Sequence, residues 1–353
     1  MNNKKPDIKS MDLTELTEFI TAAGQKPFRG RQLYQWMHQK CATSIDEMTN
    51  LPKAFRDELK EGCTYTVLKQ ANVQASTQDG TRKYLFLLED GNMVESVFMR
   101  YKTGNSVCIS SQAGCRMGCK FCASAIDGLS RNLTPSEMLE QVYQISRDTG
   151  ERVSNVVVMG TGEPLDNYDN LLQFLTLLCN EDGIHMSQRN VTVSTCGLVP
   201  QILELARKKL QITLAISLHA ASQQKRCSLM PVANRYGIED LMAACRYYFE
   251  MTGRRITFEY SLFAGVNDSK EDATMLCGLL SGMNCHVNLI PVNPVKGREF
   301  VPPGKEGLLS IKKHLEQKGI PVTVRRTLGS DIDAACGQLR KKYMEIAEKS
   351  PLS

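Results

Sequence analysis

Apolar residues recur three and four positions apart over residues 12–24, 28–40 and 44–61. This spacing places them on one side of a helix and predicts three amphipathic helices. Asp12 precedes the first of them as a candidate cap, and Pro52 interrupts the third. The first 60 or so residues therefore predict a small helical module.

The period changes to two over residues 64–101, where β-branched and aromatic residues are frequent. Asp79-Gly80 and Asp90-Gly91 are typical of turns between strands, so the segment predicts a β-meander. Glu95 falls in the last of these strands. The ordinary expectation for such a carboxylate is the exposed face of an edge strand.

Beyond residue 132 the chain alternates between helical and strand patterns. The strands are short and apolar, as in parallel sheets covered on both faces. Counting the strand before residue 108, about six β/α units follow one another, which implies a parallel sheet with helical crossovers. The helical patterns cover residues 133–150, 168–180, 200–209, 236–253, 269–282 and 304–319. The strand patterns cover residues 155–160, 190–195, 212–220, 255–263, 285–293 and 321–327.

Composition places the 353-residue chain among soluble globular proteins, since 42% of its residues are hydrophobic and 23% are charged. No apolar run is long enough to span a membrane, and the N-terminus lacks the apolar core of a secretory signal. Thirteen cysteines without such a signal favour a reducing cytoplasm over a disulfide framework. The net charge of +5 is compatible with nucleic acid but is weak support for it.

The densest chemistry lies in residues 108–122, CISSQAGCRMGCKFC. Cys115, Cys119 and Cys122 form a C-x3-C-x2-C array, with Cys108 seven residues upstream. Three thiolates ligate three corners of a four-iron cube and leave one iron open to a substrate. A structural zinc site usually has four protein ligands, so zinc would need a distant one. The spacing favours a [4Fe-4S] cluster, and zinc remains the alternative.

Polar residues recur where the predicted strands end, which is the edge that carries active sites in parallel barrels. Glycines after the strand at 155–160 expose backbone amides, and Glu163 could receive an ammonium group. Each of these residues could instead belong to a turn or a helix cap, and a lone histidine is more often structural. The candidate binding residues are Gly162, Glu163, Ser194, Ser217, Leu218, His219 and Asn293.

The cysteine spacing, with Phe121 before the last cysteine, resembles the radical S-adenosylmethionine (SAM) superfamily. Gly160-Thr161-Gly162-Glu163-Pro164 is similar to the superfamily motif that binds the amino group of SAM. The resemblance implies an α/β fold, a partial (β/α)6 TIM-type barrel. We expect an accessory unit at 1–95 (helical module plus meander), the barrel at 96–330 and a C-terminal segment at 331–353.

A second singular feature is Cys336, which lies among small residues in TLGSDIDAACGQLR beyond the last strand. Small neighbours favour an accessible thiol. Together with GTGEPLDNYDN, STCG, SLHA and LIPVNP, this segment resembles the bacterial dual-specificity adenine-C2 methyltransferases of 23S rRNA and tRNA. The resemblance extends over nearly the whole chain.

That resemblance implies a mechanism with two SAM molecules per turnover. One SAM methylates Cys336, and the second binds the open iron and is cleaved to a 5′-deoxyadenosyl radical. The radical takes a hydrogen atom from the S-methyl group, and the resulting carbon radical adds to C2 of an adenine. Glu95 matches the proton acceptor, and Cys108 matches the thiol that resolves the adduct through a transient disulfide with Cys336.

The same resemblance implies RNA partners, an external flavodoxin-like or ferredoxin-like electron donor, and a monomer. An adenine must leave its stack to enter a deep pocket. Basic residues are candidates for phosphate contacts, although those of the helical module could equally form a solvated face. They are Arg29, Arg31, Lys40, Arg325, Arg326 and Arg340.

Three alternatives remain open. A related resistance enzyme methylates C8 of the same rRNA adenine with the same cluster and both cysteines, although RMGCKFCASAIDGLSRNL and the long N-terminal region look more like the C2 group. A radical SAM enzyme could act on a small molecule or peptide. A cluster- or zinc-containing RNA-binding protein without catalysis is the third.

Overall fold

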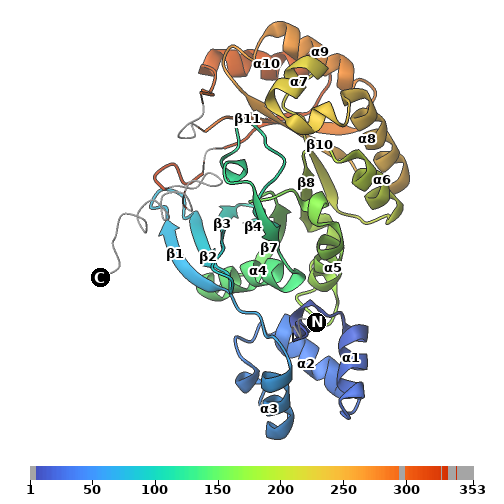
Figure 1. The fold of residues 1–353 in the computed structure, drawn as a ribbon. Helices are drawn as coiled ribbons and strands as arrows, with labels where there is room; N and C mark the ends of the chain where they lie inside the picture. The colour runs from blue at the N-terminus through green and yellow to red at the C-terminus, as the bar shows by residue number, and fades with distance from the viewer. Residues whose placement is uncertain (1–4, 294–298, 327, 333–338, 340–353) are drawn as a thin grey trace.

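The computed structural model describes residues 5–293, 299–326, 328–332 and 339 (Figure 1). Within them, one sheet of ten strands runs in the order β1-β2-β3-β4-β7-β8-β9-β10-β11-β12. Strands β4 to β12 of this sheet pair in parallel, and β1 to β4 pair antiparallel. The predicted α/β fold with a partial barrel is confirmed.

The N-terminal module, as we call residues 5–62, contains α1 (Leu13–Ala22), α2 (Phe28–His38) and α3 (Lys53–Gly62). Asp12 caps α1 as expected, because its side chain accepts from the backbone N–H groups of Thr14 and Glu15. The module lies at one end of the barrel, next to its helices (Figure 1). Its short 3-10 turn η1 (Ile8–Ser10) packs on α4 (Pro135–Thr149) and α5 (Tyr168–Cys179). A second 3-10 turn, η2 (Ile45–Glu47), precedes α3.

The predicted meander is formed by β1 (Lys69–Ala75), β2 (Arg82–Leu87) and β3 (Met93–Tyr101). Its last strand pairs with β4 (Gly104–Ile109), the strand that leads toward the cysteines. The sheet is therefore continuous across the division that the sequence predicts at residue 95. Whether residues 1–95 act as a separate unit remains a prediction.

Six β/α units follow from β4 onward. Thr134 caps α4 through a capping box with Glu137, and Gly150 ends it in the left-handed conformation. The later strands are β7 (Val153–Val158), β8 (Val191–Thr195), β9 (Thr213–Ser217), β10 (Ile256–Leu262), β11 (Cys285–Pro291) and β12 (Val322–Val324). The later helices are α6 (Val199–Arg207), α8 (Ile238–Thr252), α9 (Lys270–Leu280) and α10 (Lys305–Gln317).

Several short elements were not predicted. The hairpin of β5 (Gln112–Gly114) and β6 (Leu129–Asn132) flanks the cysteines, and α7 (Gln223–Leu229) follows β9. They are too short to show a period in the sequence. The remaining 3-10 turns are η3 (Ala123–Ala125), η4 (Pro164–Asn167), η5 (Gln188–Asn190) and η6 (Pro231–Asn234).

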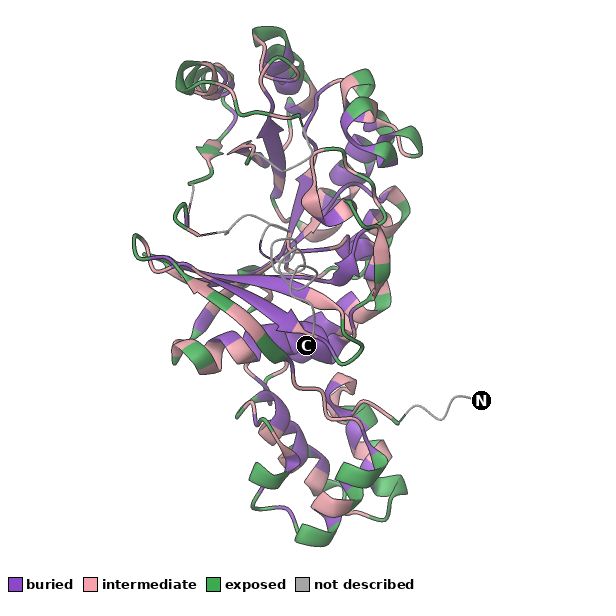
Figure 2. Ribbon diagram, turned by 60° about the vertical axis from the view of Figure 1, so that its left-hand side comes forward, coloured by how far each residue is buried: buried purple, intermediate pink, exposed green. Residues whose placement is uncertain are grey.

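The helices lie along the outer side of the curved sheet, and the buried residues concentrate in the strands and on the sheet-facing sides of the helices (Figures 1 and 2). Apolar residues on these faces provide most of the stabilisation. In the described part of the chain, no helix has both the length and the apolar character needed to cross a bilayer.

Candidate active site

The three clustered cysteines lie on one loop, residues 115–122, which we call the cluster loop. The backbone N–H of Cys115 donates to the carbonyl of Gly128 at 2.8 Å, and that of Lys120 donates to the carbonyl of Leu229 at 2.9 Å. Gly114 precedes the loop with φ of +80°, and a Cβ there would lie 2.1 Å from the carbonyl oxygen of Gly128. The chain path into the loop therefore requires glycine.

The thiols of the cluster loop are electrostatic neighbours of one another. Burial, with smaller contributions from Cys122 and Glu163, raises the pKa of Cys115 to about 12. Burial and the two other loop cysteines also raise the pKa of Cys119. Thiolates gathered in this way need bound cations to balance their charge. The donor set fits an iron–sulfur cluster, and Cys115, Cys119 and Cys122 are the residues that would hold it.

Among the described residues, no group of three or more His, Cys, Asp or Glu side chains is arranged around a single metal ion. A cube cluster does not need such an arrangement, since each cysteine binds a different iron.

The cluster loop is tied to the glycine-rich loop after β7 through residues 110–112. The backbone N–H groups of Ser111 and Gln112 both donate to the carbonyl of Thr161, at 2.9 and 3.1 Å. In return, the N–H of Glu163 donates to Oε1 of Gln112 at 2.8 Å. Gly162 has φ of +112°, and a Cβ there would lie 2.6 Å from Cβ of Gln112. The segment that leads into the cluster loop is thus hydrogen-bonded directly to the glycine-rich loop.

Glu163 is only 3% exposed, and its carboxylate is held by the backbone. Oε1 accepts from the N–H of Leu165 at 3.0 Å, and Oε2 accepts from the N–H of Cys196 at 2.7 Å. Burial raises the pKa of this carboxyl group. Because Glu163 is also an electrostatic neighbour of Cys115 and Cys119, the structure brings this predicted residue to the cluster loop.

The other predicted binding residues fall at neighbouring strand ends. Ser194 of β8 and Ser217 of β9 have their Oγ atoms 3.4 Å apart. The side chain of Leu218 is fully buried, so it offers a ligand its backbone at most. Asn293 follows β11 and is exposed.

His219 has a left-handed backbone with φ of 55° and a buried ring. Its Nδ1 accepts from the N–H of Ser261 at 2.9 Å, so Nε2 carries the proton of the neutral ring. Burial, with a smaller contribution from Arg226, lowers the pKa of His219 to about 3, and the ring stays neutral at physiological pH. The structural role and the predicted binding role are compatible, because the same ring also lines the cavity described next.

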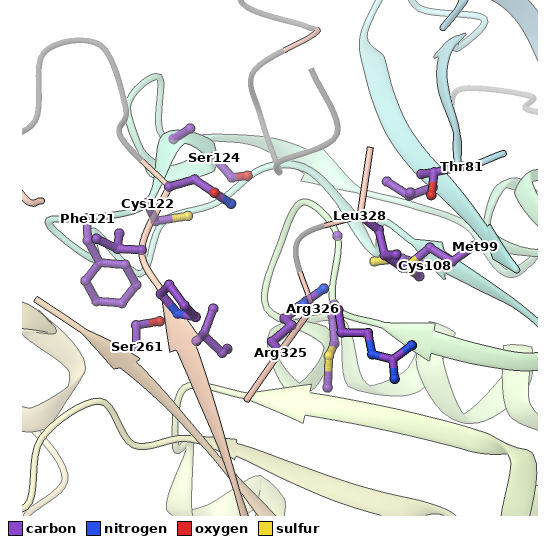
Figure 3. A pocket seen from close by; sticks show the side chains of 18 of the residues that line it. Thr81, Met99, Cys108, Phe121, Cys122, Ser124, Ser261, Arg325, Arg326 and Leu328 are labelled. Carbon is purple, nitrogen blue, oxygen red and sulfur yellow. The ribbon is translucent and has the colours of Figure 1, made fainter. Parts of the chain in front are cut away.

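A cavity of about 300 Å³ opens between the meander and the strand ends (Figure 3). Its wall contains Cys108 from β4 and Cys122 from the cluster loop, together with His219 and Asn293. Figure 3 shows Cys108 beside Met99 and Leu328 on one side, with Phe121 and Cys122 on the other. The cavity therefore joins the predicted resolving thiol to the predicted cluster. Its further lining residues include Thr81, Val97, Tyr101, Ser124, Met159, Ser261, Arg325 and Arg326.

Glu95 is not on an exposed face, and β3 is not an edge strand. The side chain is 4% exposed, and Oε2 lies 2.7 Å from Nζ of Lys83. Val97, two positions later on the same face of β3, lines the cavity and pairs with Cys108 of β4. The structure thus places Glu95 next to the cavity wall and on its side of the sheet.

The basic residues proposed for RNA contact divide into two groups. Arg325 and Arg326 line the cavity. In the N-terminal module, Arg31 forms an ion pair with Asp182 at 2.7 Å, and Nζ of Lys40 lies 3.7 Å from the ring centroid of Trp36. Cys336 and Arg340 lie outside the described residues, as does the predicted disulfide of Cys336 with Cys108.

Sequence reasoning missed four buried polar residues near the site. Gln141 of α4 donates to the carbonyl of Ser110 and accepts from Ser96, which links α4 to β3 and β4. No local motif marks these residues, and only their polar side chains among apolar neighbours could have drawn attention to them. The missed residues are Lys83, Gln141, Arg226 and Glu259.

A parallel partial barrel whose first β/α loop carries C-x3-C-x2-C defines a radical SAM enzyme. Residues 109–277 match the model of the radical SAM superfamily, and residues 6–64 match the ribosomal RNA large subunit methyltransferase N-terminal domain. The chain belongs to the RlmN family of radical SAM dual-specificity RNA methyltransferases.

The relatives are similar over almost their full length. A protein of Lachnospira eligens named "Probable dual-specificity RNA methyltransferase RlmN" is 60% identical, covering 98% of each chain. One of the same name from Clostridium perfringens is 51% identical, over 96% of this chain and 98% of the relative. A crystal structure of a radical SAM methyltransferase from Sphaerobacter thermophilus has 44% identity and a TM-score of 0.90, covering 94% of this chain and 98% of the other.

Proposed function

We propose that this enzyme methylates C2 of specific adenosines in 23S rRNA and tRNA, with Cys336 as the methyl carrier. The observation that carries the proposal is the shared cavity. Cys108, which has no place in the cluster, faces the same space as Cys122 of the cluster loop. The names of the relatives support an RNA substrate.

Each residue has a role in this proposal. Cys115, Cys119 and Cys122 hold the [4Fe-4S] cluster, which with bound SAM supplies the radical chemistry. The carboxylate of Glu163 accepts hydrogen bonds from the ammonium group of SAM. The rest of SAM is surrounded by Gly162, Ser194, Ser217, Leu218, His219 and Asn293. Adenine C2 is a poor nucleophile, so a carbon held on Cys336 next to the base is a better route than direct polar transfer.

Glu95 and Cys108 complete the proposed cycle. Glu95 accepts the C2 proton of the tethered base, and the unpaired electron of the adduct passes to a one-electron acceptor, an oxidised iron–sulfur centre. Cys108 then attacks the sulfur of Cys336: the S–S bond forms as the C–S bond breaks, and the methylene carbon takes that electron pair and a proton to become the methyl group. Arg325 and Arg326, on the cavity wall, are suited to hold RNA phosphates near the entering adenine. We further infer a cytoplasmic monomer that receives electrons from a flavodoxin-like or ferredoxin-like donor.

The test is the identity of the methylated nucleoside. Adenosine from 23S rRNA and tRNA is analysed by mass and fragmentation in cells with the gene, without it, and with Cys336→Ala. We expect 2-methyladenosine in both RNA classes only when Cys336 is intact. Finding only 8-methyladenosine would assign the enzyme to the C8 alternative, and finding neither would refute an RNA substrate.

A further inference from the structure

A buried ion pair lies on the cavity side of the meander. Nζ of Lys83 is 2.7 Å from Oε2 of Glu95, and the two side chains are 1% and 4% exposed. Lys83 pairs with Val97 across β2 and β3, while Glu95 pairs with Leu85. The lysine and the glutamate are therefore diagonal neighbours on one face of the sheet, a separation that long side chains bridge.

This face of the sheet is the one that meets the cavity. Thr81, just before β2, and Val97 and Met99 on β3 alternate in step with Lys83 and Glu95, and all three line the cavity. Val97 pairs with Cys108 on β4. Lys83 thus lies in the same cross-strand row as the predicted resolving thiol, with Val97 between them, and Glu95 is two residues from Val97 along β3.

Burying two charges is costly, and a buried pair often stabilises no better than two apolar residues of the same size. A carboxylate left alone in such a place is favoured in its neutral form, in which it cannot accept a proton. An ammonium group in contact keeps it ionised and fixes one oxygen. These two effects are what a buried proton acceptor requires.

We propose that Lys83 is a positioning residue for the methyl-transfer reaction: its ammonium group holds Glu95 ionised and oriented toward the tethered adenine. The inference rests on the proposed role of Glu95. When Glu95 accepts the proton, its O–H bond forms as the C2–H bond of the adduct breaks, and the electron pair of that bond stays on the adenine. The unpaired electron left by the radical addition passes to a one-electron acceptor, an oxidised iron–sulfur centre. Lys83 keeps its own protons throughout.

The first experiment uses cluster-loaded enzyme with SAM, reductant and an RNA substrate under anaerobic conditions. Lys83→Met is expected to lower the release of methylated RNA by about 100-fold or more, as for loss of a general base. Cys108 and Cys336 are intact in this variant, so the covalent enzyme–RNA adduct accumulates and is visible on a denaturing gel. Glu95→Gln gives the same pattern, and Lys83→Arg recovers much of the release.

The matched control is Lys9→Met, which breaks another buried lysine–glutamate pair of 2.8 Å outside the cavity. It is expected to lower stability without accumulating the adduct. If Lys83→Met releases product as Lys9→Met does, or fails to accumulate the adduct, the inference is wrong. If Lys83→Met does not fold, Lys83→Gln takes its place, because it removes the charge but keeps a polar side chain. The same loss of release and the same accumulation of adduct are then expected.

A second measurement does not depend on the reaction. Infrared difference spectra of RNA-free holoenzyme compare Lys83→Met with Lys83→Met/Glu95→Gln. A neutral carboxyl band in the single variant, lost in the double variant, supports the inference, and its absence overturns it. If the unchanged enzyme makes no methylated adenine, the proposed function fails, and the infrared result still decides whether Lys83 keeps Glu95 ionised.

Discussion

Two buried lysine–glutamate pairs have nearly the same geometry but different surroundings. Lys9 and Glu140 join η1 to α4 at 2.8 Å, and both side chains are completely buried. Nζ of Lys9 also donates to the carbonyl of Thr66 at 2.7 Å, and Oε2 of Glu140 lies 3.0 Å from Nη2 of Arg147. Every charge of this pair is matched within the protein.

Lys83 and Glu95 join β2 to β3 at 2.7 Å, on the face that meets the cavity. The opposite face of β3 packs toward α4, where Ser96 donates to Gln141 at 2.8 Å. The difference teaches that burial alone does not identify a catalytic charge. Lys9–Glu140, the junction pair, links the N-terminal module to the barrel, and Lys83–Glu95, the cavity pair, is the one that we propose serves the chemistry.

The largest expected effect is on the cavity side of this comparison and comes from a substitution in the cluster loop. Cys119→Ala removes one of the three proposed iron ligands, so we expect loss of the cluster's visible absorption and of all methylated product. The folded state should survive, because the loop is held by backbone hydrogen bonds. Iron content, absorption and circular dichroism measure this. Cys179→Ala, at the end of α5, is the control, and equal iron loss in it would contradict the assignment.

At the junction the expected change is in stability. Lys9→Met leaves Glu140 buried without its ammonium partner, and breaking such a pair typically costs about 3–5 kcal/mol. We expect the urea midpoint to fall, with the turnover of the remaining folded enzyme nearly unchanged. Lys312→Met breaks a solvent-facing pair on α10 and should cost no more than about 1 kcal/mol. Equal losses of stability in Lys9→Met and Lys312→Met would contradict a special role for the buried pair.

The glycine-rich loop provides a smaller test on the cavity side. Gly162→Ala places a Cβ 2.6 Å from Cβ of Gln112 at a φ of +112°, a conformation that costs about 1–3 kcal/mol for other residues. Because the loop carries Glu163, we expect SAM to bind about tenfold more weakly, measured by equilibrium dialysis of the holoenzyme. Gly278→Ala, in open space on α9, should leave binding unchanged.

The smallest effect concerns acid sensitivity at the junction. Burial, with a smaller contribution from Lys9, lowers the pKa of His38 to about 3. Below pH ~6.5 the unfolded chain takes up a proton there and the folded chain does not, so stability falls as the pH falls. Between pH 7.5 and 5.5, the free energy of unfolding of His38→Gln should fall by about 1.4 kcal/mol less than that of the unchanged protein. Urea titrations measure this, and equal losses would contradict it.

The sequence was informative where function depends on residues close in the chain. The C-x3-C-x2-C spacing and the glycine turn before Glu163 are local patterns, and they follow β4 and β7 at the strand ends where the sequence predicts them. The alternation of strands and helices was sufficient for the order of the barrel units.

Contacts between distant residues could not be predicted in the same way. The meeting of Lys83 and Glu95 depends on the register of β2 against β3, which no local pattern reveals. The burial of Glu95 depends on a wall of other segments covering the cavity face. For α7, the segment QQKRCSL is too short and polar to show a helical period.

The central claim, a methyl group carried by Cys336, is tested most directly by an isotope chase. Enzyme is first methylated with SAM bearing a ¹³C methyl group, freed of that SAM, and then given unlabelled SAM, reductant and RNA. The account predicts that the label leaves the Cys336 peptide and is found at C2 of adenine in the first turnover. Unlabelled 2-methyladenosine in that turnover, with the label still on the protein or never on Cys336, would contradict it.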